Sequence, residues 1–217
     1  MKKYLILAVL FILPIVAYLF FSSGVNHFAK LPVKTENIGS LSDFKSLDGD
    51  SLQLKKNISI LLFFGDQVKS MQGNAIHIKE KIFDKNHAFS DFQLIIVAKN
   101  GMQTEAKALE DELKQTVATK NWRFAFGSEA QQKALFKRLK TDLSLDEHQS
   151  TAFAFIIDKE RNLRGRDDDE GEGDFYGYNT QSVAVLNNKM IDDVDVILAE
   201  YRLALKKYRE NNKIQAK

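Results

Sequence analysis

Three continuous apolar runs in the body of the sequence limit the folds that this chain can adopt. They are ISILLFF (58–64), FQLIIVA (92–98) and TAFAFIID (151–158). A run without polar alternation is typical of a strand that is covered on both faces of a sheet. Segments with apolar residues at helical spacing separate these runs. Strands that alternate with helices predict an α/β fold around a central sheet.

The segments around these runs predict the remaining elements. Helical spacing is found at 75–83, 103–117, 129–139 and 182–209. WRFAF (122–126) predicts a short strand, LRGR (163–166) an edge strand, and Asp48-Gly49 the turn of a hairpin over 44–54. This order of elements matches a thioredoxin-like fold, a central β-sheet flanked by helices.

The N-terminus predicts a membrane segment. Lys2 and Lys3 precede an uncharged stretch from Tyr4 to Phe21, which is long enough for a slightly short membrane-spanning helix. A cleaved signal peptide is the alternative, but its apolar region is usually shorter and ends in a small-x-small site, whereas this stretch ends in YLFFSS. We therefore expect a retained transmembrane helix. The two lysines favour a cytoplasmic N-terminus, which places the body on the periplasmic side of the inner membrane.

Four regions follow from this pattern. Residues 1–22 form the predicted anchor, and 23–39, which contain Pro32 and polar residues without period, form a linker. Residues 40–210 form the folded domain and 211–217 a tail.

The composition excludes several classes of function. The chain has no cysteine, which rules out disulfides, thiol redox catalysis and cysteine-ligated metals. Its net charge of +2, without a Lys/Arg run that interleaves aromatics, predicts no nucleic-acid partner.

The C-terminal half resembles a known family. HQSTAFAFIIDKERNLRGRDDDEGEGDFYGYN (148–179) and NNKMIDDVDVILAEYRLALKK (187–207) are similar to the SCO/SenC family. These are membrane-anchored, thioredoxin-like proteins linked to copper delivery during cytochrome c oxidase assembly. The resemblance covers most of 40–208 and implies a thioredoxin-like fold, with respiratory oxidase subunits or copper-handling proteins as partners.

The functional residues of that family match this chain only in part. The family uses a Cys-x-x-x-Cys motif after the central strand and one distal histidine. His148 matches the histidine, since it lies ten residues before Asp158, but FFGDQVKSMQ (63–72) stands where the two cysteines are expected. Copper binding and thiol redox activity therefore do not follow from the resemblance.

A remnant metal site is one reading of the soft ligands that remain. Cu(I) prefers thiolate, thioether and imidazole, so Met71 and His148 could hold it weakly. The alternative is that Met71 only plugs the junction and His148 is an ordinary loop residue. We predict no resident cofactor beyond weakly bound copper.

The acidic stretch RDDDEGEGD (166–174) and the aromatic FYGYN (175–179) are the candidate partner-binding surface. Its predicted residues are Asp167, Asp168, Asp169, Glu170, Phe175, Tyr176 and Tyr178. A solvated, self-repelling loop and aromatics buried over the sheet are the alternatives. A Ca²⁺ site is disfavoured, because the spacing does not match an EF-hand loop.

Together these features predict a membrane-anchored protein that works by binding and is not an enzyme, as an accessory factor in oxidase assembly or copper homeostasis. A weak metal-binding protein that uses His148 and Met71, and a purely structural thioredoxin-like domain, are the other hypotheses.

Overall fold

The computed structural model describes residues 2–22, 30–114, 121–167 and 173–215. In this part of the chain, seven strands form one mixed sheet in the order β1-β6-β5-β2-β3-β4, with β7 paired to β5. The strands are β1 Val33–Thr35, β2 Ile58–Gly65, β3 Phe92–Lys99, β4 Trp122–Gly127, β5 Phe153–Ile157, β6 Leu163–Arg164 and β7 Tyr178–Asn179.

The apolar runs form the centre of the sheet. Every residue of β2 is buried, as expected for a strand covered on both faces. It pairs in parallel with β3, from Ile58 opposite Phe92 to Phe63 opposite Val97, and antiparallel with β5. Because β2 and β3 are parallel, their C-terminal ends meet at one edge of the sheet. The predicted α/β fold with a central sheet is confirmed.

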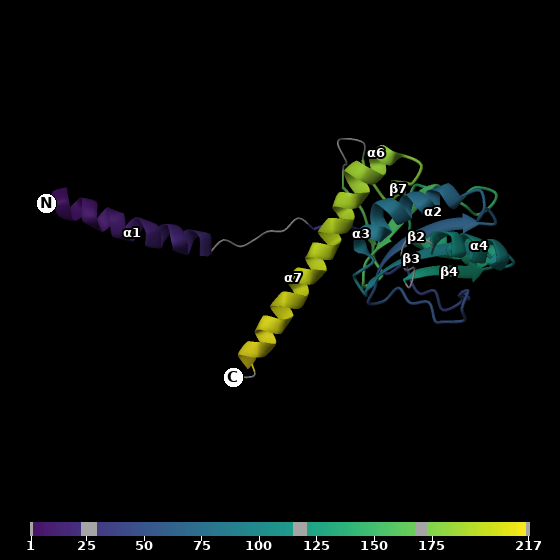
Figure 1. Cartoon of the computed structure of the whole chain (residues 1–217), viewed down its shortest axis with the longest axis horizontal. Helices are drawn as coiled ribbons and strands as arrows, with labels where there is room; N and C mark the ends of the chain where they lie inside the picture. Colours follow the sequence, from purple (N-terminus) through teal and green to yellow (C-terminus); the bar gives the residue numbers. More distant parts are fainter. Residues whose placement is uncertain (1, 23–29, 115–120, 168–172, 216–217) are drawn as a thin grey trace.

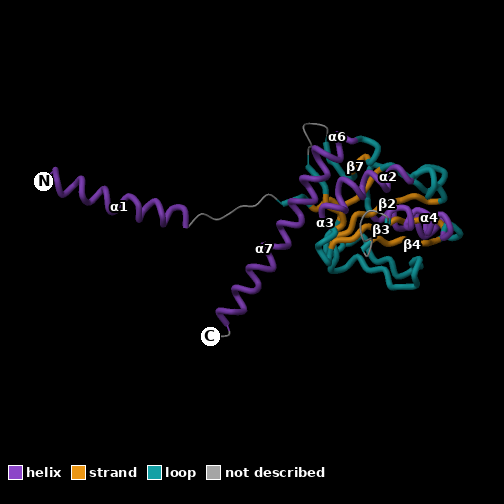
Figure 2. The backbone as a smooth tube through the Cα atoms, in the orientation of Figure 1, coloured by secondary structure: helices purple, strands orange, loops and turns teal. Residues whose placement is uncertain are grey.

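The helices are α1 Lys2–Ser22, α2 Gln72–Ile78, α3 Asp84–Asn86, α4 Gln103–Leu113, α5 Glu129–Arg138, α6 Val183–Val185 and α7 Ile191–Gln215, with π-helical turns η1 Lys79–Phe83 and η3 Leu186–Met190. Of these, α2, α4 and the start of α7 pack on one face of the sheet (Figures 1 and 2) and α5 on the other. The helix predicted over 182–209 is therefore a continuous run of α6, η3 and α7. Ser128 caps α5 with a reciprocal capping box to Gln131, which explains why that helix starts after β4.

One hydrophobic cluster lies on each face of the sheet. One contains Ile60, Leu62 and Phe64 of β2 and packs against α2, α4 and α7. The other contains Leu61 and Phe63 of the same strand and packs against α5 and the loop over 38–54. The alternation of side chains along β2 thus supplies both core layers.

The start of the domain differs from the prediction. Val33–Thr35 pairs with β6, and Leu31 and Ile38 are buried, so the described part of the predicted linker 23–39 belongs to the domain. LRGR, predicted as an edge strand, is consequently covered by β1. The pattern was missed because a three-residue strand is too short to show alternation.

The predicted hairpin over 44–54 is also wrong. Lys45 forms only an isolated bridge with Phe126, while Phe44, Leu52 and Leu54 are buried in the second cluster. Their spacing reflects burial of a loop against the sheet and not strand pairing. In the described ranges, no helix is both long and apolar enough to cross a bilayer.

Candidate functional site

The C-terminal end of β2 contacts a loop that is distant in the sequence. This is the segment that stands where the resembled family has its two cysteines. Gly65 has a φ of +54°, a conformation that is strained for a residue with a Cβ. A Cβ at this position would lie 1.8 Å from the carbonyl oxygen of His148. Glycine is therefore required here by both the backbone conformation and the close approach of the loop.

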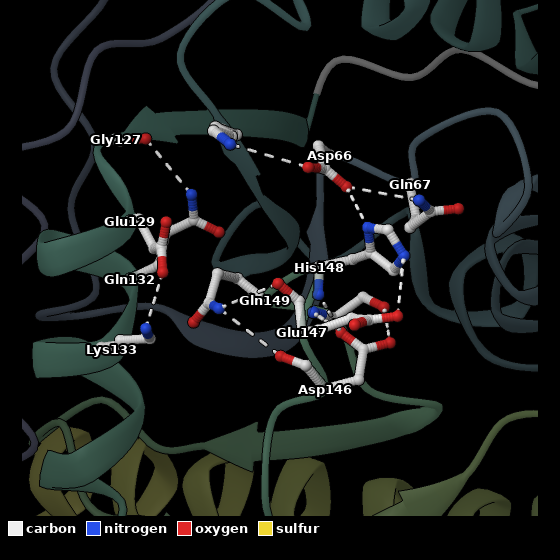
Figure 3. A network of polar contacts seen from close by, with 12 residues as sticks. Asp66, Gln67, Gly127, Glu129, Gln132, Lys133, Asp146, Glu147, His148 and Gln149 are labelled. Atoms are coloured by element: carbon white, nitrogen blue, oxygen red, sulfur yellow. Dashed lines mark hydrogen bonds and ion pairs between the residues drawn. The ribbon is translucent and has the colours of Figure 1, made fainter.

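Asp66 joins this junction to two other elements. Its backbone N–H donates to the carbonyl of His148 at 3.2 Å, and its Oδ1 lies 3.0 Å from Nδ1 of the same histidine. Its Oδ2 lies 3.6 Å from Nζ of Lys99, the last residue of β3. Figure 3 shows the Asp66 carboxylate facing the imidazole. The other ring nitrogen, Nε2, lies 3.6 Å from Oε1 of Glu147, so the imidazole stands between two carboxylates. A carboxylate oxygen accepts hydrogen bonds, so the Nδ1–H tautomer of His148 fits the contact with Asp66.

The loop that presents His148 is organised by Asp146. Its Oδ1 accepts from the backbone N–H groups of His148 at 3.0 Å and Ser150 at 2.8 Å, and its Oδ2 accepts from the Ser150 hydroxyl at 2.7 Å. Burial opposes ionisation of Asp146, but the hydrogen bonds from Ser150 and His148 outweigh it and lower the pKa of this carboxyl below 3.8. The carboxylate therefore fixes the backbone that carries the imidazole.

The two predicted metal ligands are brought to one pocket. A pocket of about 370 Å³ is lined by both Met71 and His148, together with Gln67, Ser70 and Ser150. Met71 lies at the start of α2 and His148 on the loop before β5, so 77 residues of sequence separate two side chains that share one cavity. The sequence-based pairing of these residues is consistent with this geometry.

The donor set limits the chemistry of this site. The chain has no thiol, so it has no thiolate for disulfide exchange. Within the described ranges, no three His, Asp or Glu side chains are grouped so as to hold a metal ion. One thioether and one imidazole nitrogen match the preference of Cu(I) for soft ligands. These two side chains are the soft ligands that the pocket offers.

Lys34 forms ion pairs with two residues of the acidic stretch. Asp167 and Asp174 lie 2.6 Å and 2.9 Å from Nζ of Lys34, whose side chain is only 6% exposed. Burial lowers the pKa of Lys34, but the hydrogen bonds and charges of the two aspartates outweigh it and raise that pKa. Asp168, Asp169 and Glu170, also predicted for the partner surface, lie outside the described residues.

The aromatic residues of the predicted partner surface divide into two groups. Tyr178 is fully buried, and its hydroxyl donates to Asp193 at 2.6 Å. It is therefore a core residue, and its assignment to a partner surface is wrong. Phe175 and Tyr176 are partly exposed. Lys189 lies 5.2 Å from the ring centre of Phe175, and Lys34 lies 5.3 Å from that of Tyr176.

Sequence reasoning missed Asp66 and Lys99 as site residues. Each stands at the end of a buried strand, Asp66 directly after β2 and Lys99 as the last residue of β3. Parallel strands end at the same edge of a sheet, and polar residues there commonly line a site. The end of the second parallel strand could therefore have identified Lys99 as a candidate site residue.

Comparisons with known proteins show the fold. No family model matches the sequence, and no curated protein matches it either. Among solved structures, BsSco, described as a member of the Sco family of cytochrome c oxidase assembly proteins with a disulfide switch, matches with a TM-score of 0.55 and 14% identity. The match covers 78% of this chain and 98% of BsSco.

Two further structures support the same assignment. A provisionally assigned disulfide isomerase from Bacteroides thetaiotaomicron matches with a TM-score of 0.51 and 14% identity, over 79% of this chain and 95% of that protein. A provisionally assigned electron transport protein from Aquifex aeolicus has the same score and identity, over 76% and 98%. The chain therefore has the thioredoxin-like fold that Sco family proteins also adopt.

Proposed function

We propose that the protein is a membrane-anchored accessory factor of the Sco type, which binds a partner in cytochrome oxidase assembly or copper homeostasis and performs no redox reaction. The observation that carries this proposal is the contact between Asp66 and His148 at the exit of β2. This carboxylate–imidazole pair lies at the position where the SCO/SenC family has its cysteine-containing loop.

The contacts of this pair favour a binding role over catalysis. Disulfide exchange and thiol peroxidase chemistry both need a thiolate, and the chain has no cysteine. Asp66 is engaged by His148 and Lys99, so it is held in an ion-paired network and not left as a free base. A rigid junction beside an open pocket is suited to docking, because little conformational entropy is lost when a partner binds.

The location in the inner membrane rests on the sequence. Lys2 and Lys3 precede the uncharged segment 4–21, which by the positive-inside rule keeps the N-terminus in the cytoplasm. The domain would then face the periplasm. Labelling a cysteine introduced at Ser51, and in a second variant a cysteine inserted directly after Met1, with a membrane-impermeant reagent tests this orientation while both lysines are kept. Labelling of the inserted N-terminal cysteine alone would show the opposite orientation.

Deletion of the gene in its native host tests the assembly role. We expect lower cytochrome c oxidase activity and lower copper content per oxidase in membranes of the deletion strain. Expression of the wild-type chain should restore both, while Asp66→Ala or His148→Ala should restore less at an equal protein level. Unchanged oxidase activity and copper content after deletion would refute the role.

Weak copper binding is the second candidate, and the pocket shared by Met71 and His148 favours it. Titration of the full chain with Cu(I) against a competing chelator should give one site that is lost in His148→Ala and weakened in Met71→Leu. His87→Ala and Met102→Leu are matched controls, since both residues lie outside this pocket. Equal loss in the control variants would show binding to scattered side chains.

A further inference from the structure

A pocket of about 460 Å³ lies under the loop over 40–55, on the face of the sheet covered by α5. Its volume is within the range of small-molecule sites. Its apolar side is formed by Leu41, Phe44, Leu52 and Leu54, all buried members of the second hydrophobic cluster. Figure 2 shows this long loop, a teal tube lying along the sheet on the side away from α2. None of these residues takes part in the junction around Asp66.

The polar side of this pocket carries one sign of charge. Lys55 and Arg161 line it together with the hydroxyls of Ser40, Ser42 and Ser51, and no lining residue is acidic. Within the described part of the chain, no carboxylate forms an ion pair with Lys55 or with Arg161. The hydroxyls of Ser40 and Ser42 lie 2.9 Å apart, and that of Ser42 also donates to Asp43 at 3.4 Å. Two cations that line one apolar cavity complement an anion that also has an apolar part.

Arg161 is fixed in an unusual backbone conformation, and its side chain has no hydrogen-bond or ion-pair partner among the described residues. Its φ is +73°, a region that is strained for arginine. Its backbone N–H donates to Asp158 at 3.0 Å and its carbonyl accepts from Ile38 at 2.9 Å. Its Nε is buried without a hydrogen-bond partner among the described residues. A buried donor without a partner destabilises the fold, and strained residues with unpaired groups are concentrated at ligand sites.

We propose that this pocket binds a small organic anion, a carboxylate or a phosphate ester with a compact apolar body. The anionic group accepts hydrogen bonds from the Arg161 guanidinium and pairs with Lys55. The apolar body packs against Phe44 and Leu52, which keep a small exposed area. Occupation of the pocket satisfies the buried Nε and covers apolar surface in one step, which neither inorganic phosphate nor a neutral apolar molecule does.

Calorimetric titration of the full chain in neutral detergent micelles tests this site with three probes of similar size: benzoate, phenyl phosphate and the uncharged benzyl alcohol. We expect saturable one-to-one binding of at least one anion, with a Kd of about 1 mM or tighter, and no saturable binding of the alcohol. The anion that binds more tightly assigns the head group as carboxylate or phosphate. Raising the salt concentration should weaken the binding.

Variants locate the binding. Arg161→Gln should raise the Kd about tenfold or more, Lys55→Gln should raise it by a smaller factor, and Arg161→Lys should retain part of the affinity. Lys137→Gln, an exposed lysine of α5 outside this pocket, should leave the Kd unchanged. If Arg161→Gln does not unfold cooperatively, and so is not folded, the Kd measured for Lys55→Gln decides whether the pocket binds the anion. The proposal is overturned if neither anion binds at about 20 mM, well above that Kd, if benzyl alcohol binds as well as the anions, or if the folded variants keep the wild-type Kd.

Discussion

The carbonyl oxygen of His148 occupies the space in which a side chain at Gly65 would begin, because a Cβ there would lie 1.8 Å from it. The strand β2 and the loop before β5 are therefore in main-chain contact at this point. The same contact brings the Asp66 carboxylate to the imidazole of His148.

Gly65→Ala should strongly destabilise the protein. The substitution combines a positive φ with a steric clash against main chain, and the two effects together cost about 2–5 kcal/mol of unfolding free energy. Urea unfolding followed by circular dichroism measures the change. Gly73→Ala is the matched control, since a Cβ there meets nothing within 4 Å and alanine is the better helix former in α2 by about 0.5–1 kcal/mol. An equal loss in both variants would contradict the close approach at Gly65.

Asp146→Asn should alter the acid limb of the stability curve. The pKa of Asp146 is lower in the folded protein than its ordinary value of 3.8, so its contribution is fully present above that value and is lost as the pH falls through the folded pKa. Between about pH 5 and pH 2, the variant should therefore lose stability less steeply than the wild type. Glu147→Gln, which removes a carboxylate with an 88% exposed side chain, should keep the wild-type slope. Parallel slopes for the wild type and Asp146→Asn would contradict the role of Asp146.

Arg164→Ala should cost about 3–5 kcal/mol of unfolding free energy. Arg164 donates to Asp158 at 2.9 Å and to Glu200 of α7 at 2.6 Å, and the side chain of Asp158 is only 1% exposed. Removing the guanidinium leaves a buried carboxylate without its cation. Arg123→Ala, which breaks an exposed pair with Asp50, should cost at most about 1 kcal/mol. Guanidinium unfolding of both variants measures the difference, and similar losses would contradict the buried network.

Tyr178→Phe should lower stability without affecting partner binding. Its hydroxyl bonds a buried, charged acceptor, Asp193, so the loss should be about 1.5–3 kcal/mol. Tyr176→Phe removes a hydroxyl that bonds the exposed Asp174 at 3.3 Å and should change stability by less than about 0.5 kcal/mol. Thermal unfolding separates the two. A larger loss for Tyr176→Phe would show that the two tyrosines have the opposite roles.

Much of the sheet was predictable, because the apolar runs of its central strands are buried along their whole length. The helices were predicted from the spacing of apolar residues, although the observed helix ends differ from the predicted ones by several residues. The short strand β1 and the buried loop over 44–54 were not predictable, since neither has the length or alternation that marks a strand. Their positions are set by tertiary packing alone.

The candidate site was predictable only in part. Met71 and His148 were selected by ligand chemistry, and they do line one pocket. The partner of His148 was missed, because Asp66 lies 82 residues earlier and no local pattern joins them. Tyr178 was assigned to the surface because an aromatic-rich segment does not reveal which of its rings face inward.

The main-chain contact between the end of β2 and the 148 loop also restricts how this protein can evolve. A single substitution that introduced sulfur at position 66 would remove the acceptor of the His148 imidazole and the partner of Lys99 together. A substitution at this one position would therefore disturb three elements at once: the end of β2, the 148 loop and the end of β3.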